Sequence, residues 1–159
     1  MQPVDPRELD TGTLALFLGF TAAARVADEL AARGFAGLRF SHGYVFQHLV
    51  DAHPTVGELA GKLDMTQQGA SKTVAELERL GYVERVPDPA DARIRRVGLT
   101  PRGRAAVEAA RAARRALEER FGERSGTRRL AETRALLADL LEELGGTAAV
   151  RRREVRPPR

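Results

Sequence analysis

The chain alternates between stretches of hydrophobic residues at helical spacing and short breaks made by glycine, proline or capping residues. Residues 10–33 form the first such stretch, and Gly34 is suited to end a helix there. A second helix is predicted from Ser41, which can cap it, to His53, because Pro54 disfavours helical geometry in the preceding residue. Both segments are therefore expected to be helices with one apolar face.

A helix-turn-helix pattern follows at residues 55–80. Thr55 and Glu58 form a capping box, in which the threonine hydroxyl accepts from the glutamate amide and the carboxylate reaches back. A short turn separates this helix, which ends at Leu63, from a second helix capped by Thr66. The apolar side of the second helix is formed by Ala70, Val74, Leu77 and Leu80. That side is expected to face the core and to leave the opposite side exposed.

A two-stranded hairpin is predicted directly after the helix-turn-helix. Gly81 suits the left-handed position that ends a helix. Residues 82–86 are predicted to form a strand, residues 87–91 carry turn chemistry, and residues 93–99 form the return strand. One parity of the return strand comprises Arg93, Arg95, Val97 and Leu99. Because an isolated two-stranded hairpin is marginally stable, this one is expected to pack against the preceding helices.

Two further helices complete the predicted layout. Thr100 and Pro101 suit the start of a helix that continues to about Phe121, and residues 122–126 are expected to break it. The last helix carries leucines at alternating spacings of three and four residues, which gives it an apolar stripe. The chain is therefore predicted to be mainly helical (α+β) and to form one structural domain.

Composition and charge narrow the class of protein. The 159 residues carry a net charge of +4, and arginine is concentrated in residues 85–104 and in a predicted disordered basic tail at 145–159. No cysteine is present, which excludes disulfides and thiolate metal sites. The longest apolar run, residues 14–24, is too short to span a membrane, and residues 1–9, predicted to be flexible, do not resemble a secretory signal. A soluble cytoplasmic protein is expected.

Patterns of catalytic or metal-binding residues are lacking. The sequence has no glycine-rich phosphate loop and no Ser/His/Asp spacing. The three histidines, His42, His48 and His53, are six and five residues apart, which turns them about 240° and 140° from one another around a helix. They cannot share one metal ion without other ligands. We therefore expect neither an enzyme nor a bound metal or other cofactor.

The outer side of the second helix in the helix-turn-helix indicates DNA binding. Its first two turns carry hydrogen-bonding groups and no acidic residue, namely Gln67, Gln68, Ser71 and Lys72. Glutamine can pair bidentately with adenine, lysine can donate to guanine, and the helix N-terminus attracts phosphate. Alone, this face is equally compatible with a solvated amphipathic helix. Arg93 and Arg95, near the hairpin tip, suit a narrow minor groove or the phosphates and favour the DNA interpretation.

Residues 55–104 resemble the winged helix-turn-helix of the MarR family of regulators. The matching segments are E-L-A-G-K-L, then M-T-Q-Q-G-A-S-K-T-V-A-E-L-E-R-L-G-Y-V, then D-P-A-D-A-R-I-R-R-V-G-L-T-P-R-G-R. Thr100 and Gly103 fit the L-T-x-x-G segment that follows the family's wing. The resemblance implies that Arg93 enters the minor groove and that Asp91 orients it. Ala92 stands where many members carry another basic residue, which would weaken phosphate contact without removing the Asp91–Arg93 pair.

The resemblance implies a homodimeric, sequence-specific DNA-binding transcriptional regulator acting on a near-palindromic operator, and it favours repression. Residues 41–100 would form the DNA-binding region, and residues 10–40 and 101–144 a helical dimerisation arm. The expected DNA contacts are Thr66, Gln67, Gln68, Ser71, Lys72, Thr73, Arg79, Asp91, Arg93, Arg95 and Arg96. The expected dimer interface includes Leu14, Phe17, Leu18, Leu130, Leu137, Leu140 and Leu144.

The resemblance also implies control by a small-molecule effector bound between the arm and the DNA-binding region. Arg39, His42 and Tyr44 are the candidate ligand contacts, and a phenolic or anionic compound fits a chain without cysteine better than an oxidant does. The protein would be cytoplasmic and nucleoid-associated in a bacterium or archaeon. The alternative is a winged-helix dimerisation or protein-interaction module that does not bind DNA.

Overall fold

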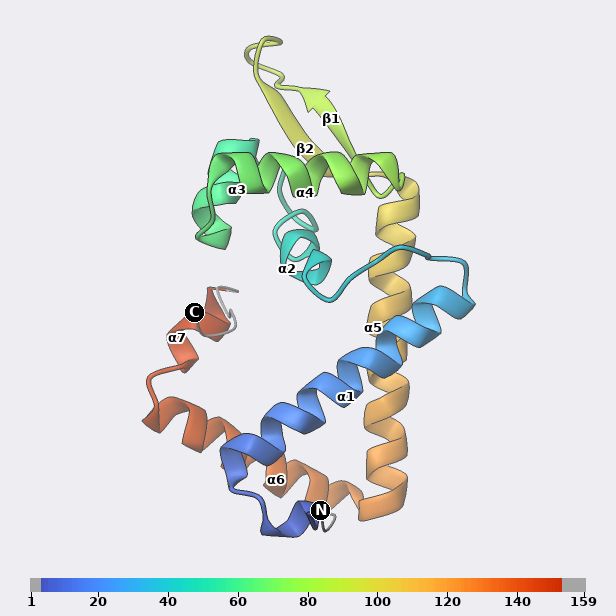
Figure 1. Cartoon of the computed structure of the whole chain (residues 1–159), viewed down its shortest axis with the longest axis vertical. Coiled ribbons are helices and arrows are strands. Elements are labelled where there is room, and N and C mark those ends of the chain that lie inside the picture. Colours follow the sequence, from blue (N-terminus) through green and yellow to red (C-terminus); the bar gives the residue numbers. More distant parts are fainter. Residues whose placement is uncertain (1–3, 153–159) are drawn as a thin grey trace.

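The computed structural model describes residues 4–152, which are mainly helical with one two-stranded hairpin, as the sequence predicts. The elements in chain order are a 3-10 turn (Pro6–Glu8), α1 (Thr11–Ala32), α2 (His42–Phe46), α3 (Val56–Leu63), α4 (Gln67–Arg79), β1 (Val83–Pro87), β2 (Arg95–Leu99), α5 (Pro101–Ser125), α6 (Thr127–Glu143) and α7 (Thr147–Arg151). Helix α5 links a lobe made of α2, α3, α4 and the hairpin to a region where α1 crosses it and α6 follows it (Figure 1). We call the hairpin, β1 and β2, the wing.

Capping side chains fix the starts of the helices in the lobe. Thr55 accepts from the Glu58 amide at 3.2 Å, while the Glu58 carboxylate accepts from the Thr55 amide at 2.9 Å, which confirms the capping box. Thr66 accepts from the Gly69 amide at 3.1 Å and so begins α4. Gly81 has a φ of +79°, the left-handed geometry that ends α4 and lets the chain turn into β1.

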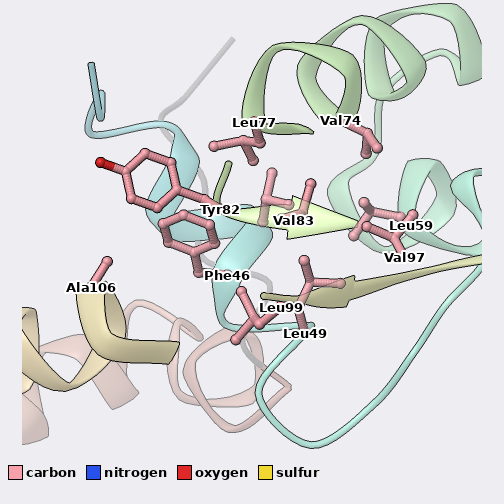
Figure 2. Close-up of a cluster of buried hydrophobic side chains, with 11 residues drawn as sticks. Phe46, Leu49, Leu59, Val74, Leu77, Tyr82, Val83, Val97, Leu99 and Ala106 are labelled. Carbon is pink, nitrogen blue, oxygen red and sulfur yellow. The ribbon is translucent and has the colours of Figure 1, made fainter. Parts of the chain in front are cut away.

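The core of the lobe joins the apolar side of α4 to the wing. Val74 and Leu77 of α4 are fully buried against Val83 of β1 and Val97 of β2 (Figure 2). Each such side chain contributes about 1.5–3 kcal/mol by its burial. The wing is therefore fixed to α4 by its base, with antiparallel pairing from Val83 opposite Leu99 to Pro87 opposite Arg95.

The junction between the wing and α5 explains the L-T-x-x-G segment. The Thr100 hydroxyl accepts from the Gly103 amide at 3.0 Å and donates to the Gly81 carbonyl at 2.6 Å, so it caps α5 and ties it to the end of α4. Gly103 is buried, and a Cβ built on it would lie 2.0 Å from the carbonyl oxygen of Tyr82. No side chain fits there, because the first turn of α5 lies directly against the backbone at Tyr82.

The predicted second helix is shorter than expected and is not capped by Ser41. Ser41 already has helical dihedral angles and its hydroxyl makes no capping bond, so α2 begins without a side-chain cap. After Phe46 the chain tightens into turns in which the amides of His48 and Leu49 donate to carbonyls three residues back. These turns bury Leu49 in the core and end the helix well before Pro54.

Two other boundaries differ from the predictions. Arg93 lies in the turn, and β2 begins at Arg95. Helix α5 continues through Gly122 and ends only at Gly126, which has a φ of +86°. Gly122 is buried where a Cβ would lie 3.4 Å from Thr127, so this glycine admits α6 close to α5 and does not break the helix.

The chain ends are more ordered than predicted over the described residues. Asp5 accepts from the Arg7 amide and caps the 3-10 turn, within the segment predicted to be flexible. Helix α7 lies within the segment predicted to be disordered. Residues 1–3 and 153–159 of these two predicted segments lie outside the described residues. Over residues 4–152, no helix combines the length and apolarity that crossing a membrane requires.

Candidate nucleic-acid interface

Helix α4 presents one exposed face outside the lobe, opposite its buried side. Gln67, Gln68, Lys72 and Arg79 are exposed on it, and Ser71 is half-buried. We call these five residues the outer face of α4. None of them is acidic, and neither Lys72 nor Arg79 makes an ion pair that is recorded among residues 4–152. The outer face therefore combines amide, hydroxyl and cationic groups that can bond to base edges and phosphates.

The N-cap of α4 and its second turn carry the other two predicted contacts from this helix. Thr66 is exposed, and its hydroxyl already accepts from the Gly69 amide. Thr73 is half-buried, and its hydroxyl donates to the Gly69 carbonyl at 3.1 Å. The amides of Gln67 and Gln68 begin the helix without intrahelical acceptors and are the ones available to an anion.

The wing tip is organised by Asp88, a residue that the sequence analysis did not single out. Its side chain is 9% exposed, and one carboxylate oxygen accepts from the amides of Ala90 (2.7 Å) and Asp91 (3.2 Å). Its other oxygen accepts from the Arg96 guanidinium. These bonds, the one from Arg96 foremost, hold the pKa of Asp88 below its ordinary value of 3.8. The signal in the sequence was the Pro-Asp-Pro turn, in which an aspartate commonly bonds the backbone ahead of it.

The arginines of the wing divide into two kinds. Arg93 and Arg95 are exposed, and no ion pair is recorded for either within the described chain. Arg96 is instead half-buried and bonded to Asp88, to the His53 carbonyl at 2.9 Å and to Glu58 at 3.4 Å. Arg96 was grouped with the expected DNA contacts. In the structure its guanidinium instead links the wing to the start of α3 through these bonds.

Asp91 acts on the backbone of Arg93. Its carboxylate accepts from the Arg93 amide at 3.0 Å, and its carbonyl accepts from the Ile94 amide at 2.9 Å. The aspartate therefore fixes the turn from which the Arg93 side chain projects into solvent. A bond between the two side chains is not recorded in the described structure, so the expected pair operates through the main chain.

A cavity of about 710 Å³ lies between α1, α2 and α5. Its wall is mainly apolar, and Arg39, Tyr44, Arg111 and Arg114 supply its polar groups together with Gln47 and Glu118. Two of the three predicted ligand contacts, Arg39 and Tyr44, line it. His42 does not line it, because its side chain is 1% exposed and contacts Arg39 and, on α4, Glu76.

His42 belongs to a polar cluster that connects the α1–α2 loop with α4. Its Nδ1 accepts from the Arg39 amide at 3.1 Å, and its Nε2 lies 3.3 Å from the Arg39 guanidinium and 3.7 Å from a carboxylate oxygen of Glu76. The Arg39 guanidinium forms an ion pair with the same oxygen. Burial lowers the pKa of His42 below its ordinary value of 6.5, although Glu76 opposes that shift. Over residues 4–152, no group of residues fits a metal ion.

The predicted arm exposes a large apolar surface. On α1, Leu14, Phe17 and Leu18 are 41%, 57% and 52% exposed. Directly after α6, Leu144 is 85% exposed, whereas Leu130, Leu137 and Leu140 of α6 are half-buried. Further exposed apolar side chains on the same two helices are Leu16, Phe20, Leu136 and Leu141. An isolated chain would leave this surface in water, which is unusual for a monomer.

Comparisons with known proteins agree with this geometry. The chain resembles a variant of S. aureus MepR with a TM-score of 0.68 and 19% identity, over 86% of this chain and 99% of that one. For the YusO protein from Bacillus subtilis the TM-score is 0.67 and the sequence identity 17%, over 89% of this chain and 99% of that one. For the MarR family transcription regulator SP03579 the TM-score is 0.62 and the sequence identity 25%, over 86% of this chain and 95% of that one. Other matching MepR structures are bound to an oligodeoxyribonucleotide and to ethidium bromide. No curated protein sequence matches the chain.

The fold is that of a winged helix-turn-helix protein. The sequence model described as the MarR family matches residues 36–94, which include α2, α3, α4 and β1. Over these residues the chain matches the MarR family, and a solved MarR family transcription regulator, SP03579, shares its fold. The resemblance inferred from the sequence is thereby confirmed.

Proposed function

We propose that the protein is a homodimeric repressor that binds a near-palindromic operator and releases it in response to a small ligand. The single observation that carries the DNA contact is the outer face of α4, where two glutamines, Lys72 and Arg79 are exposed without an acidic neighbour in the first two turns. Helices of this kind enter the major groove with their N-terminal residues at the base edges.

The wing supports a second contact on the same DNA. Arg93 and Arg95 project from a tip that Asp88 and Asp91 hold in one conformation. The backbone of the tip therefore loses little conformational entropy on binding. From this tip the two guanidinium groups can reach the minor groove or the phosphates beside the major groove occupied by α4. Arg96 is excluded from this role in the proposal, since its charge is neutralised within the chain.

The exposed apolar faces of α1 and α6 support a dimer. A second copy that covered Leu14, Phe17, Leu18 and the leucines of α6 would remove a surface that water disfavours. Two copies related by a two-fold axis would then present two α4 helices to half-sites one helical turn apart, about 10 bp, on one side of the DNA. Repression follows if such a site overlaps a promoter.

The cavity beside Arg39 and Tyr44 supports an effector site. A volume of about 710 Å³ is in the range of cavities that hold small organic ligands, and an apolar wall with three arginines suits a phenolic or anionic compound. A structure of MepR, a protein of the same fold, contains ethidium bromide, whose organic ion is a cation. The proposal of an anionic or phenolic ligand for this chain is therefore based on the residues of its own cavity and not on MepR.

Selection of bound fragments from genomic DNA tests the proposal and supplies the operator. On that operator Arg93→Ala is expected to lower affinity at least tenfold, whereas Lys72→Ala should relax the preference at one or two base pairs, each worth about 1–3 kcal/mol. Arg120→Ala, an exposed arginine on α5, is the matched control for the loss of one charge. If the selection returned no enriched sequence and both variants bound as the wild type does, the chain would be a winged-helix interaction module.

A further inference from the structure

Arg39 takes part in two sites that otherwise share no side chain. Its guanidinium forms an ion pair with Glu76 on α4, and its side chain also lines the cavity between α1, α2 and α5. Neither Glu76 nor His42 reaches the cavity wall. Among the described residues, Arg39 is therefore the one cation that touches both the cavity and the helix that carries the outer face.

Glu76 lies where its charge affects the outer face. It follows Lys72 by four residues, so it stands one helical turn further along α4, on the flank of that face. Its side chain is 27% exposed, and the Arg39 guanidinium neutralises it. A carboxylate left without this cation would repel the phosphates of a bound duplex and compete with them for Lys72.

The Arg39–Glu76 pair is weak enough to be displaced. The Arg39 side chain is 61% exposed, and ion pairs at that exposure contribute little because water and salt screen them. The other two arginines of the cavity cannot transmit the binding of an anion to α4 in this way. Arg111 is bonded to Glu108 at 2.6 Å on its own helix, and Arg114 contacts no residue of α4 that is recorded in residues 4–152.

We infer that Arg39 is the positioning residue that couples the cavity to DNA binding: an anion on the cavity wall draws its guanidinium away from Glu76 and leaves α4 with an unbalanced negative charge. This inference rests on the proposed function, because it takes α4 as the DNA contact and the cavity as the effector site. It deepens that proposal by naming an anion as the effective ligand and one ion pair as the link. The reverse also follows, since DNA binding favours the neutralised Glu76 and so opposes the anion.

The lack of cysteine allows the charge to be placed at one position. Gly43 lines the cavity, is exposed, and lies four residues after Arg39 on the turn that begins α2. A Cβ built there meets nothing within 4 Å, so a Gly43→Cys variant should fold. Iodoacetate would then add a carboxylate beside Arg39, whereas iodoacetamide would add a neutral group of nearly the same size. With no other cysteine in the chain, each reagent modifies one site per chain.

The carboxymethylated variant is expected to bind its operator about three- to tenfold more weakly than the carboxamidomethylated one at low salt. In a Glu76→Gln background this difference should shrink to less than twofold, because no carboxylate is left for Arg39 to neutralise. Glu78→Gln is the matched control, since Glu78 lies on the same helix but pairs with Arg85, and it should keep the full difference.

The outcomes separate the inference from the proposed function. Equal binding by the two modified forms, or an equal difference in the Glu76→Gln background, would overturn the role of Arg39 and leave DNA binding by α4 intact. If the unmodified Gly43→Cys chain, folded by circular dichroism, bound no duplex that the selection had enriched, the proposed function itself would be wrong and the inference with it.

Discussion

Replacing Gly103 by alanine should loosen the joint between the wing and α5. The added Cβ would lie 2.0 Å from the Tyr82 carbonyl oxygen, whereas carbon and oxygen atoms in contact stay about 3.3 Å apart. The first turn of α5 must therefore move by more than about 1 Å, which costs about 1–3 kcal/mol as overpacking. The move also strains the 3.1 Å bond from the Thr100 amide to the Tyr82 carbonyl, worth about 1 kcal/mol.

The higher helix propensity of alanine offsets less than about 1 kcal/mol of this cost. We expect a net loss of about 2–3 kcal/mol in the free energy of unfolding, and a melting temperature lower by about 5–10 °C. Urea unfolding at one fixed protein concentration measures the first quantity and calorimetry the second. The concentration is held fixed because the stability of the proposed dimer would depend on it.

Gly61→Ala is the matched control for this prediction. Gly61 is exposed within α3, and a Cβ built there meets nothing within 4 Å. The same chemical change should therefore raise stability there by up to about 1 kcal/mol. If Gly103→Ala unfolded at the same urea concentration as the wild type, or at a higher one, α5 would not lie against the backbone at Tyr82 as described.

Three other predictions concern pH and assembly. Burial lowers the pKa of His42, so the unfolded chain binds a proton before the folded chain does, and stability should fall as the pH drops below about 6.5; urea midpoints at pH 7.5 and 5.5 should differ less for His42→Gln. Because the pKa of Asp88 is lowered in the folded chain, its carboxylate stabilises the fold above about pH 3.8. This stabilisation is lost as the pH falls through the pKa of the folded state, so Asp88→Asn should lose less stability than the wild type on acidification from pH 5 to 3. Phe17→Asp should weaken the dimer at least tenfold by light scattering, whereas Asp28→Asn, on a distant turn of α1, should leave its mass unchanged.

Local chemistry explains how much of the fold could be predicted from the sequence. The capping box at Thr55, the start of α5 at Thr100 and the end of α4 at Gly81 each depend on residues within four positions of one another, and all three predictions are confirmed. Gly122 misled the prediction because its role is set by packing. A glycine in a helix can mark a break or a close neighbour, and only the position of α6 decides between them.

The candidate site shows the same limit. The exposed face of α4 follows from its helical periodicity, and the exposure of Arg93 and Arg95 follows from their position near the tip of the wing. The pairing of Arg96 with Asp88 depends on the register of the wing, and the pairing of Arg39 with Glu76 joins residues 37 positions apart. No local pattern in one sequence carries those contacts, so Arg96 was grouped with the exposed arginines and Glu76 was passed over.

Because α5 is long, a small change in its tilt produces a large displacement at its other end. Its 25 residues span about 37 Å at 1.5 Å per residue, from the capped turn at Thr100 to Gly126, where α6 begins. A tilt of about 5° around the far end would displace the base of the wing by about 3 Å, close to the rise of one base pair. If the wing contacts DNA as proposed, a small rearrangement where α1 and α6 contact α5 would thus shift the wing by about one base-pair step and move its arginines away from the groove.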